Sequence, residues 1–324
     1  MRQRDSGSSS RRFVIALGGN AIIPSGHRGT FDEQIVLTRK TMDQVAELSR
    51  NGHEIVLTHG NGPVVGNIVL RNAAGLEKHG IPPMPLYVCG ADSQGGIGYM
   101  IQQTLQNSLR ACGIQRAVAA LVTQVIVARD DPAFEQPTKP IGPFYTAEQA
   151  AQLRRENGWT VVEDAHRGWR RVVPSPQPIE VVEWEVIRAM IQAGIIAIAA
   201  GGGGVPVARD DAGELHGIDA VIDKDRASAL LGKLIGADTL VIVTSVDRVF
   251  RAFGTPQAQP LSHLTAGEAK QLLDAGEFPA GSMGPKIEAA LAFLADGGRR
   301  VLITNPGSIL RGLEGGSGTW IESD

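Results

Sequence analysis

The hydrophobic positions along the chain follow two spacings, which predict a mixture of buried strands and amphipathic helices. Continuous apolar runs end in glycine turns, as in Phe13–Gly19 (FVIALGG) and Glu54–Gly60 (EIVLTHG). Between them, residues 32–52 place apolar side chains such as Met42 and Val45 on one face of a helix. Strands separated by helices of ~15 residues favour a mostly parallel sheet covered on both faces. The pattern therefore predicts an α/β fold.

The same alternation continues through the rest of the chain. Helices are expected from Pro63 onward and over Gly98–Ala111. Further strands are expected within residues 117–127 (AVAALVTQVIV), 194–204 (GIIAIAAGGGG), 239–247 (TLVIVTSVD) and 299–305 (RRVLITN). The C-terminal segment GLEGGSGTWI is expected to add an edge strand.

Shifts in composition divide the chain into parts. Residues 1–12 (MRQRDSGSSSRR) are polar and are expected to form a disordered tail. Prolines and charges cluster over about residues 130–178, which favours a small protruding subdomain or lid, since so long a structureless loop is uncommon. The glycines at 201–204 are expected to separate an N-terminal lobe, residues 13–205, from a C-terminal lobe, residues 206–324. A hinge is the alternative for this cluster.

Composition narrows the classes of protein. The chain has 43% hydrophobic and 5% aromatic residues with 40 glycines, which suits an aliphatic parallel sheet with many tight turns. A net charge of −3 without a long basic block argues against a nucleic-acid partner. No apolar run reaches the ~18 residues of a membrane span, and the N-terminus lacks the apolar core of a secretion signal. Cys89 and Cys112 alone form neither a disulfide framework nor a zinc site, so a cytoplasmic protein is expected.

Two glycine turns that follow strands are candidate anion sites. Glycine lets backbone N–H groups approach a phosphate closely, and helix N-termini attract anions. The turns contain Gly18, Gly19 and Asn20 in the first case, and Gly60, Asn61 and Gly62 in the second. A plain tight turn is the alternative for the first. The second, THGNGPVVG, also fits a loosened dinucleotide fingerprint, although its polar, stiff sequence suits a small anion better. His59 is expected to be a hydrogen-bonding turn residue.

Three lysines are candidates for neutralising a polyphosphate. Lys224 and Lys286 each begin an expected helix, where a cation opposes the helix dipole and calls for an anion or a neighbouring carboxylate. Asp223 is a reasonable N-cap for the first helix, and Asp225 follows Lys224. Lys139 lies among prolines that would hold it on a stiff loop. Solvated surface charges are the alternative for each lysine.

Several of these motifs together resemble one family. ALGGNA, THGNGPVVG, CGADSQGGIGYMIQ, PTKPIGPFY, GWRRVVPSPQP, AVIDKD and GSMGPK resemble the carbamate kinases of the amino acid kinase superfamily, over about residues 13–321. The resemblance implies a three-layer αβα sandwich with a central, mostly parallel sheet and a small protruding subdomain. It also implies a homodimer that transfers the γ-phosphoryl group of ATP to carbamate, reversibly and with Mg²⁺. The N-terminal lobe would bind carbamate and the C-terminal lobe the nucleotide.

The resemblance also implies roles for individual residues. Catalytic roles fall to Lys139, Lys224, Lys286 and Asp225, and the two glycine turns would hold the substrate. Residues expected near the nucleotide are Gly201, Gly202, Gly203, Ser245, Asp247, Met283 and Lys286. No protein side chain is expected to ligate a metal.

The chemistry of the residues fits this family. Phosphoryl transfer asks mainly for alignment and charge neutralisation, and a carbamate oxygen is already anionic, so no general base is required. Asp92 and Gln94 either face the site or cap a helix. Two alternatives stay open: another acyl kinase that acts on an acidic amino acid, and a nucleotide sensor without turnover.

Overall fold

The computed structural model describes residues 11–19, 29–164, 168–279 and 281–324. The strands of its central sheet are β1 (Arg12–Leu17), β2 (Glu54–His59), β3 (Val118–Ala120), β9 (Ile196–Ile198), β12 (Thr239–Val243), β15 (His263–Thr265), β16 (Arg300–Thr304) and β17 (Thr319–Glu322). They lie in the order β15-β17-β16-β12-β1-β2-β9-β3, and every neighbouring pair is parallel except β16–β17. The predicted mostly parallel sheet is confirmed.

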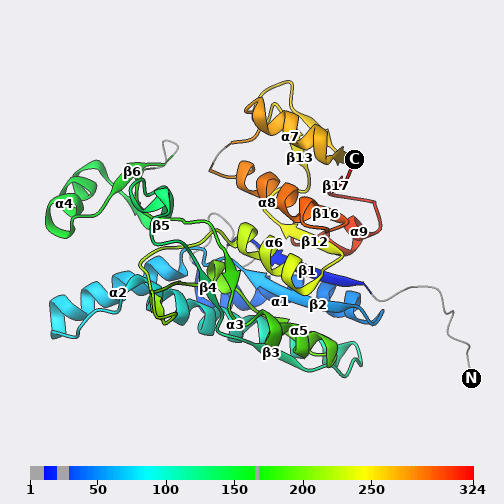
Figure 1. Ribbon diagram of the computed structural model, residues 1–324, viewed down its shortest axis with the longest axis horizontal. Coiled ribbons are helices and arrows are strands. Elements are labelled where there is room, and N and C mark those ends of the chain that lie inside the picture. Colours follow the sequence, from blue (N-terminus) through cyan, green and yellow to red (C-terminus); the bar gives the residue numbers. More distant parts are fainter. Residues whose placement is uncertain (1–10, 20–28, 165–167, 280) are drawn as a thin grey trace, which may run out of the picture.

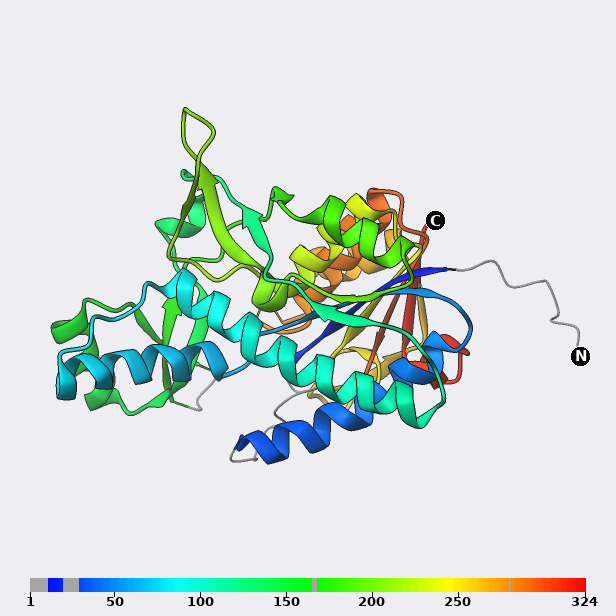
Figure 2. The ribbon, with the colours of Figure 1, turned by 90° about the horizontal axis from the view of Figure 1, so that it is seen from below.

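Helices cover both faces of this sheet (Figures 1 and 2). One face carries α1 (Phe31–Ser49), α3 (Leu86–Ala111) and α9 (Ile309–Leu313); the other carries α5 (Trp184–Gln192), α6 (Lys224–Ile235), α7 (Ala266–Asp274) and α8 (Gly284–Ala295). Alternate residues of β1 pack against the helices on opposite faces of the sheet. Phe13 and Ile15 pack with α1 and α3, whereas Val14 and Ala16 pack with α6 and α8. The predicted three-layer αβα sandwich is confirmed.

Local sequence explains where key helices begin. Thr30 caps α1 through a capping box with Glu33, and Asp223 caps α6, as expected. The α3 helix begins at Leu86, well before the expected Gly98, because it follows Pro85 directly. The remaining long helix is α2 (Val64–His79), which begins after Pro63 as predicted.

A separate small unit protrudes beside the main body (Figure 1). It contains β5 (Lys139–Tyr145), β6 (Val161–Glu163), β7 (Trp169–Val173) and α4 (Ala147–Asn157). The three strands form an antiparallel sheet in the order β5-β7-β6, apart from the central sheet. This unit lies within the stretch where a protruding subdomain is expected.

Other strands form two smaller sheets. One contains β4 (Gln124–Ile126), β8 (Glu180–Val181), β10 (Val205–Arg209) and β11 (Leu215–Gly217), and the other pairs β13 (Val249–Arg251) with β14 (Gln259–Leu261). Short 3₁₀ turns occupy Pro132–Phe134 and Gly201–Gly203. The expected lobe boundary after residue 205 falls at the first residue of β10, which pairs with β4 before that boundary and with β11 after it. The four-stranded sheet of β4, β8, β10 and β11 therefore crosses the expected boundary.

Three expectations about element limits are wrong. The run 117–127 contains two strands, β3 and β4, in different sheets; between them the backbone of Thr123 bonds to the side chain of buried Gln94. The C-terminal segment supplies β17, which lies inside the sheet while β15 takes the edge. Of the expected tail, residues 1–10 lie outside the described residues, but Arg12 begins β1 and its guanidinium lies 2.7 Å from Glu54.

Among the described helices, none is long and apolar enough to cross a membrane.

Candidate active site

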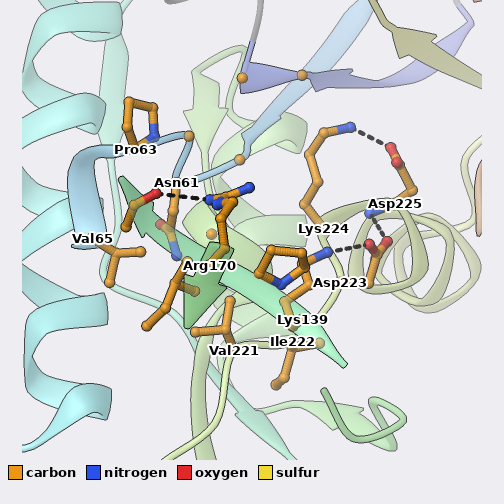
Figure 3. A pocket seen from close by; sticks show the side chains of 18 of the residues that line it. Asn61, Pro63, Val65, Lys139, Arg170, Val221, Ile222, Asp223, Lys224 and Asp225 are labelled. Carbon is orange, nitrogen blue, oxygen red and sulfur yellow. Dashed lines mark hydrogen bonds and ion pairs between the residues drawn. The ribbon is translucent and has the colours of Figure 1, made fainter. Parts of the chain in front are cut away.

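A cavity of about 510 Å³ opens at the carboxyl ends of β1 and β2 (Figure 3). Both glycine turns contribute to its wall through Gly18, Gly19, Gly60, Asn61 and Gly62. In open α/β sheets the carboxyl ends of the strands are where ligands bind. Asn20, which was expected to belong to this wall, lies outside the described residues.

The two turns lie against each other because their glycines lack side chains. A Cβ on Gly19 would lie 3.3 Å from the Cα of Gly62, and a Cβ on Gly18 would lie 2.6 Å from the carbonyl oxygen of Val243. The second distance is shorter than real Cβ contacts. The first turn therefore needs glycine to fit between β2 and β12.

The three lysines predicted from the sequence meet at this cavity, held by two aspartates. Lys139 Nζ lies 2.6 Å from Oδ2 of Asp223, the residue that caps α6. Asp225 pairs with Lys224 through Oδ1, and its Oδ2 lies 3.3 Å from Lys286 Nζ. All five residues line the cavity. Residues from the protruding unit and from two helix N-termini thus converge on one site.

Burial sets the electrostatics of this cluster. Burial lowers the pKa of Lys224, and the neighbouring Asp225 carboxylate opposes that effect. Burial alone would raise the pKa of Asp223, but the ammonium of Lys139, with those of Lys224 and Lys286, holds it well below its usual range. Three ammonium groups face two carboxylates, so the site favours an anion.

Asn61 is held in place by residues from two distant segments. Ser93 Oγ lies 2.6 Å from Asn61 Oδ1, and a Cβ on Gly202 would lie 2.1 Å from that same oxygen. Gly202 therefore lies on the Asn61 side of the first cavity, and neither Gly201 nor Gly203 is in the lining of the two cavities, although the expectation placed all three near the nucleotide. Gln94 is buried against Thr123, whereas Asp92 is exposed; neither lines the cavity.

His59 is a buried member of the second turn. Its Nδ1 lies 3.1 Å from the carbonyl oxygen of Gly60, so this nitrogen carries the proton and donates. Burial, together with the smaller effect of the nearby Lys224 ammonium, lowers the pKa of His59 to about 4. A neutral, hydrogen-bonded imidazole agrees with the expected turn residue.

A second cavity of about 400 Å³ adjoins the first and shares Thr244 and Lys286 with it. Of the residues expected near a nucleotide, Ser245 and Met283 line this cavity with Lys286, whereas Asp247 is exposed and is not in the lining. Aromatic side chains form much of the wall; they are Phe250, Phe253 and Phe278. Such walls suit the flat face of a base.

Sequence reasoning missed Phe278 and did not place Arg170 at the cavity. Phe278 precedes α8 in a loop where no periodicity marks it. Arg170 lines the first cavity, and its Nη2 donates to the carbonyl oxygen of Gly142 at 3.0 Å. From the GWRR motif, Arg170 and Arg171 are expected either to pin the protruding segment or to be ordinary surface cations.

Comparison with known proteins identifies the family. Residues 11–305 match the amino acid kinase family. The chain belongs to the amino acid kinase family. The carbamate kinase of Pyrococcus horikoshii is 50% identical and that of Pyrococcus furiosus 48%, each match covering 96% of this chain and 98% or 99% of the relative. A solved structure of Giardia lamblia carbamate kinase bound to AMP-PNP superimposes with a TM-score of 0.89 at 40% identity, covering 98% of this chain and 99% of that one. Within this family, the chain groups with the carbamate kinases, and a dinucleotide-binding fold is excluded.

Proposed function

We propose that this protein is a carbamate kinase, which transfers a phosphoryl group reversibly between ATP and carbamate. The main support for this proposal is that Lys286 lines both of the adjoining cavities and belongs to a cluster of three lysines and two aspartates. Relatives of nearly the same length are carbamate kinases. The aromatic cavity would take the base of the nucleotide and the glycine turns would take carbamate, so the phosphates would lie beside the lysines.

The reaction follows from what these residues supply. With carbamoyl phosphate and ADP, the bond from phosphorus to the carbamoyl oxygen breaks, and a bond to a β-phosphate oxygen of ADP forms. Carbamate leaves as an anion, so no side chain must donate or remove a proton. Lys139, Lys224 and Lys286 neutralise the charge that spreads over the transferred group, while Asp223 and Asp225 keep the ammonium groups in place.

Mg²⁺ fits this site as a companion of the nucleotide. Both carboxylates that line the first cavity are paired with lysines. Among the described residues, the cluster with metal-ligand spacing is Asp210, Glu214 and His216, on the exposed β10–β11 hairpin outside both cavities. A magnesium ion would therefore be carried mainly by phosphate oxygens and water, and would neutralise phosphate charge.

Formation of ATP from carbamoyl phosphate, ADP and Mg²⁺ tests the proposal. Robust ATP formation supports both the phosphoryl donor and the class of reaction. A folded protein that binds ADP but forms no ATP would contradict it. Replacing carbamoyl phosphate with acyl phosphates of acidic amino acids separates the related kinases, and nucleotide binding without any turnover would indicate a sensor.

We further propose that the protein acts as a homodimer in the cytoplasm, as its resemblance to carbamate kinases implies. Sedimentation equilibrium of the purified chain tests the first point. A mass of one chain at micromolar concentration would contradict it.

A further inference from the structure

A contact between two glycines joins the protruding unit to the main body close to Lys139. Gly66, the third glycine of THGNGPVVG, lies near the start of α2, and Gly142 lies on β5 three residues after Lys139. A Cβ on Gly66 would lie 2.1 Å from the Cα of Gly142 and 2.3 Å from its nitrogen. Real Cβ atoms essentially never come that close, and backbone atoms cannot turn away as a side chain can. The contact therefore requires glycine at Gly66.

The chain around Gly142 is shaped for this contact. The pairing of β5 with β7 is regular at Lys139 and Ile141, and its register shifts before Tyr145. Gly142 lies in that irregular stretch with a φ of 71°, in the left-handed region that glycine favours. Its carbonyl oxygen accepts a hydrogen bond from Arg170 Nη2 at 3.0 Å. Gly142 is thus hydrogen-bonded by Arg170 and lies against Gly66 of α2.

Apolar packing continues the contact toward the cavity. Val65 of α2 is buried in a small cluster with Ile141 of β5 and Val173 of β7, at 1%, 3% and 3% exposure. Pro140 and Pro143 stiffen β5 on either side of Gly142. A shift of β5 at Gly142 would therefore be carried along the strand to Lys139, whose ammonium reaches Asp223.

From this geometry we propose that Gly66 is a positioning residue for Lys139. The contact between Gly66 and Gly142 sets how closely the protruding unit approaches the main body, and so fixes the Lys139 ammonium beside Asp223 at the first cavity. A methyl group at Gly66 moves β5 outward by more than an ångström and takes Lys139 away from the transferred phosphoryl group. The consequence for catalysis rests on the proposed carbamate kinase activity.

The central experiment compares Gly66→Ala with Gly75→Ala. Both residues lie on α2, but a Cβ on Gly75 would meet nothing nearer than 3.8 Å, in side-chain atoms of Ile81. Alanine favours a helix more than glycine does, so neither variant weakens α2 itself. A displacement of this size costs about 10²-fold in turnover. We expect that loss of kcat only in Gly66→Ala. KM for ADP should stay unchanged, because no residue of α2 lines the aromatic cavity. Unchanged kcat in Gly66→Ala would overturn the proposal.

A double-mutant cycle separates positioning from general damage. If Gly66 acts through Lys139, adding Gly66→Ala to Lys139→Ala causes no further loss of kcat. An equal loss in both backgrounds would overturn the proposal. If Gly66→Ala does not fold, Gly142→Ala replaces it in the same double-mutant cycle with Lys139→Ala. This substitution strains β5 at the contact and leaves the sequence of α2 unchanged.

A readout that needs no turnover completes the test. Lys139 is labelled with an amine reagent and quantified by mass spectrometry, with Lys270 as the exposed reference. We expect faster labelling of Lys139 in Gly66→Ala than in the unmodified protein or Gly75→Ala, and equal labelling would contradict the displacement. If the unmodified protein makes no ATP from carbamoyl phosphate, the proposed function fails, whereas this labelling still tests the contact.

Discussion

Oδ2 of Asp225 lies 3.3 Å from Nζ of Lys286, although 61 positions separate the two residues in the chain. The other oxygen of the same carboxylate pairs with Lys224. One buried aspartate therefore holds two ammonium groups that would otherwise repel each other, at the N-termini of α6 and α8. The positive charge of the site is kept in place when no phosphate is bound.

Asp225→Asn removes this shared counter-charge. Lys224 is buried and would lose its closest carboxylate, so we expect the free energy of unfolding to fall by about 3–5 kcal/mol. We also expect kcat to fall, because the two ammonium groups are no longer aligned. Urea unfolding and steady-state ATP formation measure the two effects.

Asp296→Asn is the matched control for that variant. It removes the exposed partner of Lys233, 2.8 Å away, and such a pair contributes about 0–1 kcal/mol. If Asp225→Asn is no less stable than Asp296→Asn, the shared carboxylate does not have the role described here.

Lys286→Ala tests the charged residue that both cavities share. The ammonium group would contact phosphate in either direction of the reaction, so we expect kcat to fall by about 10³-fold or more. The fold should persist, because Pro285 and the apolar face of α8 remain. Lys270→Ala, which breaks an exposed pair with Asp274, should keep full activity. Near-normal turnover of Lys286→Ala would remove the residue from the catalytic set.

The sequence predicts those structural features that depend on residues close together in the chain. The apolar runs of β1 and β2 end in glycine, and Asp223 caps α6 through its own side chain, so strands, helix start and lysine placement could all be predicted. The convergence of Lys139 with Lys224 came from the resemblance. Spacing alone cannot show that a strand of a protruding unit reaches Asp223, 84 positions away.

Contacts between distant segments explain what the sequence did not show. The run 117–127 is apolar except at Thr123 and Gln124, and its pattern cannot reveal that the backbone of Thr123 bonds to Gln94, which is 29 positions away. Similarly, the resemblance to carbamate kinases implies that Gly201, Gly202 and Gly203 lie near the nucleotide. The place of Gly202 beside Asn61 depends instead on the path of the chain, including Ala200 at a φ of 47°.

His59 predicts a pH dependence of stability. Its pKa is about 4 in the folded protein against 6.5 in the unfolded chain, because burial penalises the imidazolium. Between these values the unfolded chain binds a proton that the folded protein does not, so stability rises with pH from 4 to 6.5. The contribution lost on lowering the pH from 7 to 4.5 is about 2–3 kcal/mol.

Urea unfolding of His59→Asn across this range checks the prediction, since an asparagine amide can also donate to the Gly60 carbonyl. We expect the variant to lose that part of the pH dependence. His263→Gln is the control, because His263 is exposed beside Glu322 and should leave the dependence intact. A dependence that is identical in His59→Asn would show that His59 titrates normally.

Phe250→Ala tests whether the second cavity takes the nucleotide base. Phe250 and Phe253 form part of its aromatic wall, with ring centroids 5.9 Å apart. Stacking of a base on an aromatic ring contributes about 1–3 kcal/mol, so KM for ADP should rise by about tenfold or more. KM for carbamoyl phosphate should stay unchanged, because Phe250 does not line the first cavity. Phe31→Ala, at an exposed residue of α1, supplies the control. If KM for carbamoyl phosphate rises instead, the two cavities take their ligands in the opposite arrangement.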